Sequence, residues 1–378
     1  MFENAREIQS EIISQLEADI QNDLVAQSSL FYGVEFTGKL TTALDLASVL
    51  TGQEIPQLLK SQGAAIITSR NSKLRLDATF SLWEKYSNSY FRNKVIQEVR
   101  IFTSQFQDSI STLTKKESEN IRLDKIGEIL LDLENERDYK TEEVKRIVKD
   151  LKSYLTPLIN KNQKGSALSI EMIRLLQLWL STSSGDNKKV AILENIEDIS
   201  VGAKNSLLKL LEEPPENAYL ILISNNPNKL LDTILSRVRK YEFKAIDKKK
   251  AHKIISTKYY SEGDDFYSFY LQKAYGDDFS KLDKMASYYL SSLLEGKRMD
   301  VEALNEIVDV LDRYQTYNYF YTLVSERLKE ATLAGSISYI KAKKLLNIIN
   351  ERINIGQTYN QNQHNILDYV YRECCNGN

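Results

Sequence analysis

The segment from Lys188 to Phe243 restricts the possible folds of this chain more than any other segment. Two continuous apolar runs, Val190–Leu193 and Tyr219–Ser224, have the length and composition of strands that are buried on both faces. The intervening Ser200–Glu213 carries the leucines of a helix that packs on a sheet. The two prolines that follow end this helix, because each of them lacks an N–H group. Strands that alternate with helices in this way predict a parallel sheet covered on both faces.

The first 80 residues predict further parts of the same sheet. Ser29–Tyr32 is a short apolar run, and Leu40–Leu50 has a helical pattern that ends just before a glycine. Ala64–Thr68 is a second apolar run, and Leu74–Thr79 alternates apolar and polar side chains as a half-buried strand does. With a further helix before the first run, we therefore expect three strands and two helices in this part of the chain.

Charged sequence with a helical period interrupts this pattern from about residue 82 to residue 165. Apolar stripes within Ile126–Leu133 and Val144–Leu155 predict two helices, with Arg137–Lys140 as the turn between them. We expect an inserted helical hairpin whose charges form a solvated face rather than a binding surface. The sequence assigns this hairpin no function. The α/β pattern returns with a helix at Ile170–Leu180.

No strand pattern follows residue 243, and a chain of 378 residues is too long for one ordinary core. We predict an α/β plus all-α fold with three domains. Residues 1–244 form the parallel-sheet domain with its insertion at about 82–165, residues 245–292 form a small helical domain, and residues 293–378 form a C-terminal helical domain. Helical patterns within this last domain lie at Val301–Tyr314, Tyr317–Ala331 and Ile337–Ile353.

The composition excludes several classes of protein. A formal net charge of −2 does not suggest a strong standalone nucleic-acid binder. Cys374 and Cys375 are adjacent and are the only cysteines, which excludes a zinc module and fits a reducing cytosol. His252 and His364 have no second ligand at metal spacing, so we expect no metal site. The N-terminus is polar and no apolar run reaches ~20 residues, so we expect a cytoplasmic protein without a membrane span.

A phosphate-loop pattern lies between the first predicted strand and the next helix. The sequence GVEFTGK, from Gly33 to Lys39, has the GxxxxGK spacing. In such a loop the glycines let backbone N–H groups face phosphate oxygens, and the lysine reaches the terminal phosphates. The next residue should carry the hydroxyl that holds Mg²⁺, but it is Leu40. We expect Gly33, Gly38 and Lys39 to keep the loop shape, with impaired or lost binding of magnesium nucleotide.

The strand Val190–Leu193 leads into Glu194-Asn195, where an active ATPase normally has Asp-Glu. In that pair the aspartate supports Mg²⁺ and the glutamate polarises the attacking water. Glu194 could still approach a cation, whereas the amide of Asn195 cannot serve as a general base. Both residues could instead simply cap the strand. Because both phosphate-site motifs are altered in the same direction, we expect hydrolysis to be lost.

Ser236-Arg237 follows a short predicted helix at Leu230–Leu235. An arginine at the end of a helix can project into a neighbouring subunit's active site, where its planar guanidinium contacts the terminal phosphate. An isolated arginine is far more often an ordinary surface residue. The segment that precedes Arg237 favours the functional interpretation of this arginine.

The string NSLLKLLEEPPENAYLILISNNPNKLLDTILSR, which ends at Arg237, resembles the bacterial clamp-loader family, the AAA+ subunits of the DNA polymerase III holoenzyme. The resemblance covers roughly residues 2–52 and 165–245, with Val238 in place of the family's cysteine. The chain lacks the hydroxyl, the Asp-Glu pair and the zinc cysteines of the ATPase subunits, so it is most similar to the delta-prime members. Asn360 and Asn362, before an apolar run, resemble the start of their final collar helix.

This resemblance implies an AAA+ core with a helical lid and a C-terminal collar that forms a hetero-oligomer. It implies a non-hydrolysing subunit that supports ATP-dependent loading of the sliding clamp onto primer-template DNA. Arg237, with Ser236, would act in trans on ATP and Mg²⁺ bound by a neighbouring subunit, and the chain itself would bind nucleotide weakly or not at all. The implied partners are the gamma/tau and delta subunits, and no membrane.

Two alternatives remain open from the sequence. The chain could be an active gamma/tau-like ATPase, although Leu40 and Asn195 argue against it. It could also be a scaffold or interaction protein that uses its insertion on an AAA+ fold, in which case Arg237 would have no role.

Overall fold

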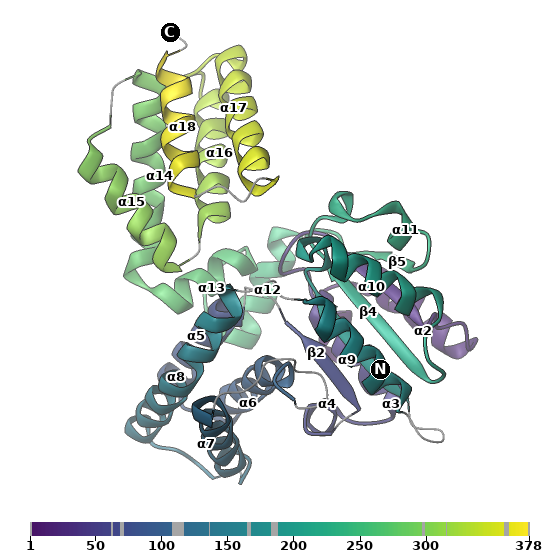
Figure 1. The fold of residues 1–378 in the computed structure, drawn as a ribbon. Helices are drawn as coiled ribbons and strands as arrows, with labels where there is room; N and C mark the ends of the chain where they lie inside the picture. The colour runs from purple at the N-terminus through teal and green to yellow at the C-terminus, as the bar shows by residue number, and fades with distance from the viewer. Residues whose placement is uncertain are drawn as a thin grey trace. The chain divides into compact units, whose positions relative to one another are not determined.

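A computed structural model describes residues 2–61, 63–68, 72–107, 117–135, 137–164, 168–182, 188–296, 299–314, 316–358 and 363–376. The chain forms two compact units, Met1–Ala274 and Tyr275–Asn378 (Figure 1). The predicted division into three domains, with boundaries at 244/245 and 292/293, stays a prediction. Among the described residues, no helix is long and apolar enough to cross a membrane.

The first unit is built on a five-stranded parallel sheet with the strand order β2-β3-β4-β1-β5. The strands are β1 Ser28–Tyr32, β2 Ala64–Ile67, β3 Lys189–Glu194, β4 Ala218–Ser224 and β5 Arg239–Glu242. The carboxyl ends of β1, β3 and β4 therefore meet at one edge of the sheet, where open α/β sheets bind ligands. The predicted α/β plus all-α class is confirmed.

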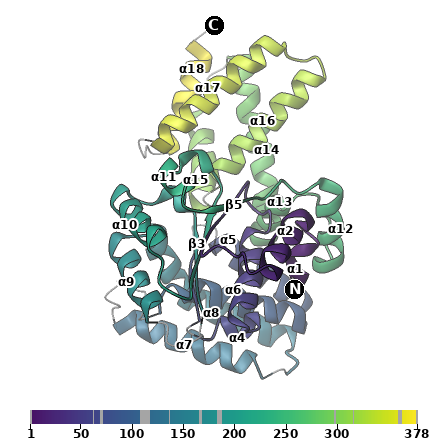
Figure 2. The same ribbon diagram turned by 90° about the vertical axis from the view of Figure 1, so that its right-hand side faces the viewer.

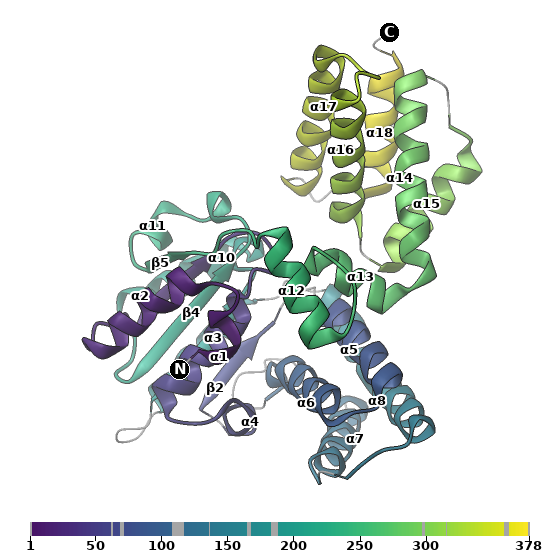
Figure 3. The ribbon, with the colours of Figure 1, turned by 180° about the vertical axis from the view of Figure 1, so that it is seen from behind.

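The sheet has a packed layer of helices on each face. Apolar residues of β1, β2, β3 and β4 alternate between two apolar clusters, so that Leu30 packs on one face and Phe31 on the other. The first cluster includes α9 Ile170–Ser181 and α10 Val201–Glu212, and the second includes α2 Ser10–Gln21 and α3 Lys39–Thr51. Figure 2 shows α9 and α10 on one side and α1 and α2 on the other, and Figure 3 views the second side.

Short elements complete the core. They are α1 Glu3–Arg6, α4 Ile55–Leu58, η1 Ile196–Asp198, η2 Pro227–Lys229 and α11 Asp232–Leu235. The helix α10 begins at its cap, where the Ser200 hydroxyl accepts a hydrogen bond from the Ala203 N–H. It ends one residue before Glu213, which precedes the two prolines, as the sequence predicts.

Four helices lie between β2 and α9, and we call these helices the insertion; the first of them begins before residue 82, where the sequence placed the start of the insertion. They are α5 Ser72–Tyr86, α6 Ser89–Ser104, α7 Glu117–Leu133 and α8 Thr141–Lys164. The predicted hairpin corresponds to α7 and α8. The predicted strand at Leu74–Thr79 is wrong, because these residues lie inside α5. Buried apolar positions continue without a turn residue through Phe80 to Trp83, so the segment forms one long helix that is buried on most of its circumference.

Two helices close the first unit, and we call them the lid: α12 Lys248–Tyr259 and α13 Phe266–Tyr275. The lid packs with the insertion in one apolar cluster.

The second unit is helical throughout its described residues. Its helices are α14 Asp277–Glu295, α15 Val301–Tyr314, α16 Tyr317–Leu333, α17 Tyr339–Thr358 and α18 Gln363–Asn376. Tyr289 of α14 is buried, and it joins two other helices of this unit: its hydroxyl donates to the Leu367 carbonyl at 2.9 Å and its ring contacts Phe320. Asn360 and Asn362 lie outside the described residues.

Candidate functional site

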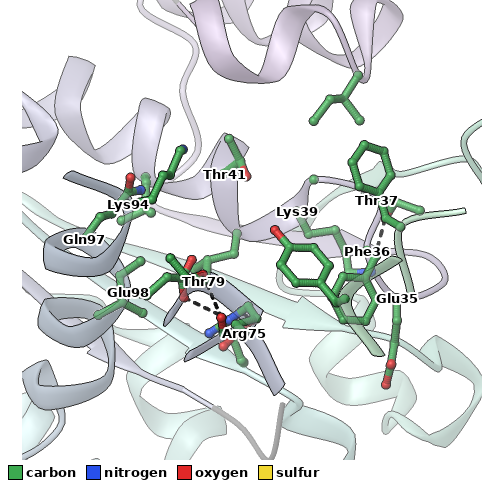
Figure 4. A pocket seen from close by; sticks show the side chains of 18 of the residues that line it. Glu35, Phe36, Thr37, Lys39, Thr41, Arg75, Thr79, Lys94, Gln97 and Glu98 are labelled. Atoms are coloured by element: carbon green, nitrogen blue, oxygen red, sulfur yellow. Dashed lines mark hydrogen bonds and ion pairs between the residues drawn. The ribbon is translucent and has the colours of Figure 1, made fainter. Parts of the chain in front are cut away.

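A cavity of about 180 Å³ lies at the carboxyl ends of β1, β3 and β4. Three parts of the first unit line it: the phosphate-loop region with β3 and β4, the insertion, and the lid. Representative lining residues are Lys39 and Glu194 from the first part, Arg75 and Glu98 from the second, and Tyr270 from the third. Figure 4 labels Lys39, Arg75 and Glu98 among them. This volume is smaller than the roughly 300 Å³ at the lower end of ordinary ligand pockets.

The first glycine of the phosphate loop is required by the backbone around it. Gly33 has a φ of 144°, and a Cβ atom at this position would lie 2.1 Å from the carbonyl oxygen of Phe243. The Gly33 N–H donates to the Ser224 carbonyl at 3.3 Å, so the loop is tied to β4 as well. Gly38, the second glycine, has a φ of 86° and precedes the first residue of α3. The loop shape therefore depends on both glycines.

The lysine of the loop is directed back onto the loop itself. The Lys39 ammonium donates to the Gly33 carbonyl at 2.7 Å, to the Val34 carbonyl, and to the Thr37 hydroxyl at 3.3 Å. The residue is only 5% exposed. Burial lowers the pKa of Lys39 to about 8, and the negative charges of Glu35, Glu194 and Glu197 oppose this effect. An ammonium has three donors, and these three acceptors of the loop satisfy all of them.

The side chains that follow Lys39 differ from those of a magnesium site. Leu40 lines the cavity with apolar atoms and packs against the core around α3. Thr41 also lines the cavity (Figure 4). The Thr42 hydroxyl donates to the Gly38 carbonyl at 2.9 Å, so this hydroxyl is bonded within the helix.

The second motif enters the cavity at the end of β3. Glu194 is 7% exposed, and its Oε1 lies 3.5 Å from the Arg75 guanidinium. Asn195 has a φ of 52° and accepts a hydrogen bond from the side-chain amide of Asn225 at 2.9 Å. The Asn225 N–H in turn donates to Glu197 at 2.9 Å. The structure thus brings the two predicted sequence motifs together, because β1 and β3, which carry them, flank β4 and end at the same edge of one parallel sheet.

Arg75 is the cavity residue that the sequence did not indicate. Its guanidinium lies 3.3 Å from Glu98 Oε2 and 3.5 Å from Glu194 Oε1, and it donates to the Thr68 hydroxyl at 3.2 Å. Burial alone lowers the pKa of Arg75, but the carboxylates of Glu194 and Glu98 outweigh it and raise the pKa above its ordinary value. Recognising 72–86 as a helix would have placed Arg75 and Thr79 on one face, one turn apart.

Opposite charges are equal in number among the residues that line the cavity. The cations are Lys39, Arg75 and Lys94, and the anions are Glu35, Glu98 and Glu194. Burial lowers the pKa of Lys94, and the nearby Glu98 opposes that shift. A triphosphate carries several negative charges, so the cavity offers no surplus of positive charge to hold it.

The predicted Ser236-Arg237 pair lies apart from this cavity, since neither residue lines it. Arg237 follows α11, and its guanidinium donates to the Thr233 carbonyl at 2.8 Å and to the Ser236 hydroxyl at 3.3 Å. It also forms an ion pair of 2.6 Å with Glu212, the last residue of α10. One third of the Arg237 side chain (34%) is exposed, so the guanidinium is held by its neighbours and still reaches solvent.

Comparisons with known proteins identify a related family over part of the chain. Residues 124–247 match the family model described as DNA polymerase III, delta subunit. The chain is 47% identical over 58 residues to DNA polymerase III subunit tau of Bacillus subtilis, which covers 15% of this chain and 10% of that protein. It is 36% identical over 86 residues to DNA polymerase III subunit delta′ of the same organism, which covers 22% of this chain and 26% of that protein.

The chain therefore aligns with about a tenth to a quarter of the length of these two curated relatives. A solved structure of a DNA polymerase III gamma-subunit-related protein from Thermotoga maritima is 20% identical, with a TM-score of 0.29, over 56% of this chain and 81% of that chain. At that score, the likeness defines neither the fold nor the function.

Proposed function

We infer from its relation to the clamp-loader subunits of DNA polymerase III, which holds over short stretches of the chain, that this protein is a delta-prime-like subunit of a clamp loader. It hydrolyses no ATP itself. It supports ATP-dependent loading of a sliding clamp onto primer-template DNA, in a complex with gamma/tau and delta subunits. Its Arg237 completes the ATP site of a neighbouring ATPase subunit.

The geometry of Arg237 is the observation that carries this proposal. The guanidinium is held at the end of α11 by the Thr233 carbonyl and by Glu212, away from the cavity of its own chain. A half-exposed ion pair of this kind contributes about 1 kcal/mol or less, so a phosphate group of a partner could replace Glu212. A planar guanidinium suits such a phosphate because it can donate two parallel hydrogen bonds.

The contacts of the cavity support the absence of hydrolysis in this chain. Lys39 is bonded to its own loop, and Glu194 is paired with Arg75 rather than free to hold a cation. Asn195 carries an amide where hydrolysis requires a carboxylate to polarise water. A magnesium nucleotide would have to displace both Lys39 and Arg75 from their present partners.

An active gamma/tau-like ATPase is the second candidate, and the match to subunit tau favours it. This candidate predicts micromolar affinity of the isolated chain for magnesium ATP. The proposal made here predicts weak or absent binding, which isothermal calorimetry on the isolated chain distinguishes. A scaffold that uses only its insertion is the third candidate, and it predicts no effect of Arg237→Ala in the complex.

The test is the ATPase rate of a reconstituted loader, with clamp and primed DNA, in which this chain is wild type or Arg237→Ala. We expect a loss of roughly 10-fold or more, as for removal of a trans arginine. Arg137→Ala is the matched control, because Arg137 is likewise an arginine held at the surface by ion pairs, in its case with Asp132 and Glu143. Equal rates for wild type and Arg237→Ala, in a complex of unchanged composition, would remove the basis of the proposal.

A further inference from the structure

We infer that the insertion takes the place of a bound nucleotide: α5 and α6 connect the phosphate-loop core to the lid and hold the two in one nucleotide-independent arrangement. The inference rests on the non-hydrolysing role proposed above, and it gives the insertion a function that the sequence did not assign. Three sets of contacts support it, and all of them lie within the Met1–Ala274 unit.

The first set is polar and centres on Arg75. This arginine comes from α5, and its carboxylate partners Glu98 and Glu194 come from α6 and β3. The three side chains are between 10% and 18% exposed. A buried guanidinium thus neutralises the carboxylate that ends β3, which is the task of Mg²⁺ in a working nucleotide site. The cation is supplied by the chain itself and needs no nucleotide.

The second set is apolar and joins the insertion to the lid. One buried cluster contains Trp83, Phe91 and Val95 of the insertion together with Ile255 and Phe269 of the lid. Burial of large apolar side chains such as these stabilises the contact between the insertion and the lid.

Tyr86 adds a directional contact to this cluster. Its hydroxyl donates to the Tyr260 carbonyl at 2.8 Å, and its ring stacks on Phe91 at a centroid distance of 5.3 Å. The end of α5 is therefore bonded to the residue that caps α12.

The third set joins the phosphate loop to the lid directly. Phe36 of the loop stacks on Tyr267 and Tyr270 of α13, with centroid distances of 5.1 Å and 5.2 Å. Phe36 has a φ of 57°, which an aromatic residue adopts only when its surroundings fix it. Tyr270 also lines the cavity and approaches Tyr259 of α12 with a hydroxyl–hydroxyl distance of 3.4 Å.

Together these contacts hold core and lid in one arrangement, as a ligand bound between two parts of a protein does. A ligand stabilises one arrangement by binding it better than the other. Here side-chain contacts within the chain stabilise one arrangement over the other. The arrangement of core and lid should therefore not respond to ATP.

Hydrogen exchange of the full chain, followed by mass spectrometry of peptides from residues 248–274, tests this inference. In the wild type we expect protected lid amides whose exchange changes less than about twofold on addition of magnesium ATP. Arg75→Gln should raise the exchange of lid amides at least about tenfold, because it leaves two buried carboxylates without their cation. Tyr86→Phe, which removes only one solvent-exposed hydrogen bond, should raise it roughly two- to threefold.

Tyr139→Phe is the matched control. The Tyr139 hydroxyl also donates to a backbone carbonyl, that of Asp132 at 2.9 Å, but within the insertion. It should leave lid exchange unchanged. Far-UV circular dichroism shows whether Arg75→Gln folds, and Tyr86→Phe tests the inference whether or not it does.

Fast lid exchange in the wild type that magnesium ATP suppresses would overturn the inference, and so would lid exchange in Tyr86→Phe equal to that in the wild type. These outcomes concern the isolated chain and leave the effect of Arg237→Ala in the complex untouched. The failure of one proposal is thus distinct from the failure of the other.

Discussion

The replacement Arg75→Met tests the stability of the cavity in a quantitative way. The Arg75 side chain is 13% exposed, and its carboxylate partners Glu98 and Glu194 are 18% and 10% exposed. Methionine keeps most of the length of arginine but removes the charge. The variant therefore leaves two nearly buried carboxylates that share no cation.

Removing one partner from a buried ion pair costs about 3–5 kcal/mol. The two ion-pair distances of 3.3 Å and 3.5 Å are longer than the roughly 2.8 Å of the strongest charged hydrogen bonds, so the lower end of that range applies. We expect the free energy of unfolding of the first unit to fall by about 3 kcal/mol. Replacing Glu98 and Glu194 by glutamine in the same variant should restore part of this loss.

Urea denaturation followed by tryptophan fluorescence is the assay. The two tryptophans, Trp83 and Trp179, are both buried in the first unit, so the signal reports that unit alone. Arg137→Met is the control, because Arg137 is 48% exposed and its loss should change stability by less than about 0.5 kcal/mol. A loss for Arg75→Met that is no larger than the loss for Arg137→Met would refute the reasoning.

Two further predictions concern the phosphate loop. Gly33→Ala should lower the free energy of unfolding by more than about 1 kcal/mol, because Gly33 has a positive φ and the new Cβ would meet the Phe243 carbonyl. Gly127→Ala is the control: Gly127 lies on α7 with open space around it, so this change should alter the free energy of unfolding little or raise it. Equal effects of the two variants in urea denaturation would contradict this prediction. The lowered pKa of Lys39, about 8, means that the unfolded chain binds more protons between pH 8 and pH 10. The free energy of unfolding of the wild type should therefore rise over this pH range, relative to that of Lys39→Met, by on the order of 1 kcal/mol per pH unit. If the free energies of unfolding of the two proteins change with pH in parallel, the prediction is wrong.

The sequence predicted those strands of the sheet that are apolar along their length because both of their faces are buried. The runs that became β1, β2, β3 and β4 are continuous and apolar, and such runs fit a parallel sheet that is covered on both faces. The strand β5 was not foreseen, because only Tyr241 of its four residues is buried. Its pairing with β1 is a tertiary contact that no local pattern encodes.

The candidate site likewise contains residues that the sequence predicted and residues that it did not. Lys39, Glu194 and Asn195 could be located because each lies at or after the carboxyl end of a strand of one parallel sheet, and such strand ends meet at one edge. Arg75, Lys94 and Glu98 come from helices that fold back onto that edge. The alternation of Leu74, Leu76 and Ala78 suggested a strand, which hid the position of Arg75. The partner of Arg237 was also hidden, because Glu212 lies 25 residues earlier in a segment interpreted only as architecture.

The turnover number of the reconstituted loader at saturating ATP, measured together with the amount of ATP bound, tests the central claim most directly. The claim is that this chain acts on ATP held by a neighbour and not on its own. With Arg237→Ala in this chain alone, we predict that turnover falls roughly 10-fold or more while the amount of bound ATP stays the same. Unchanged turnover, or a loss of bound ATP that accounts for the lower rate, would contradict the claim.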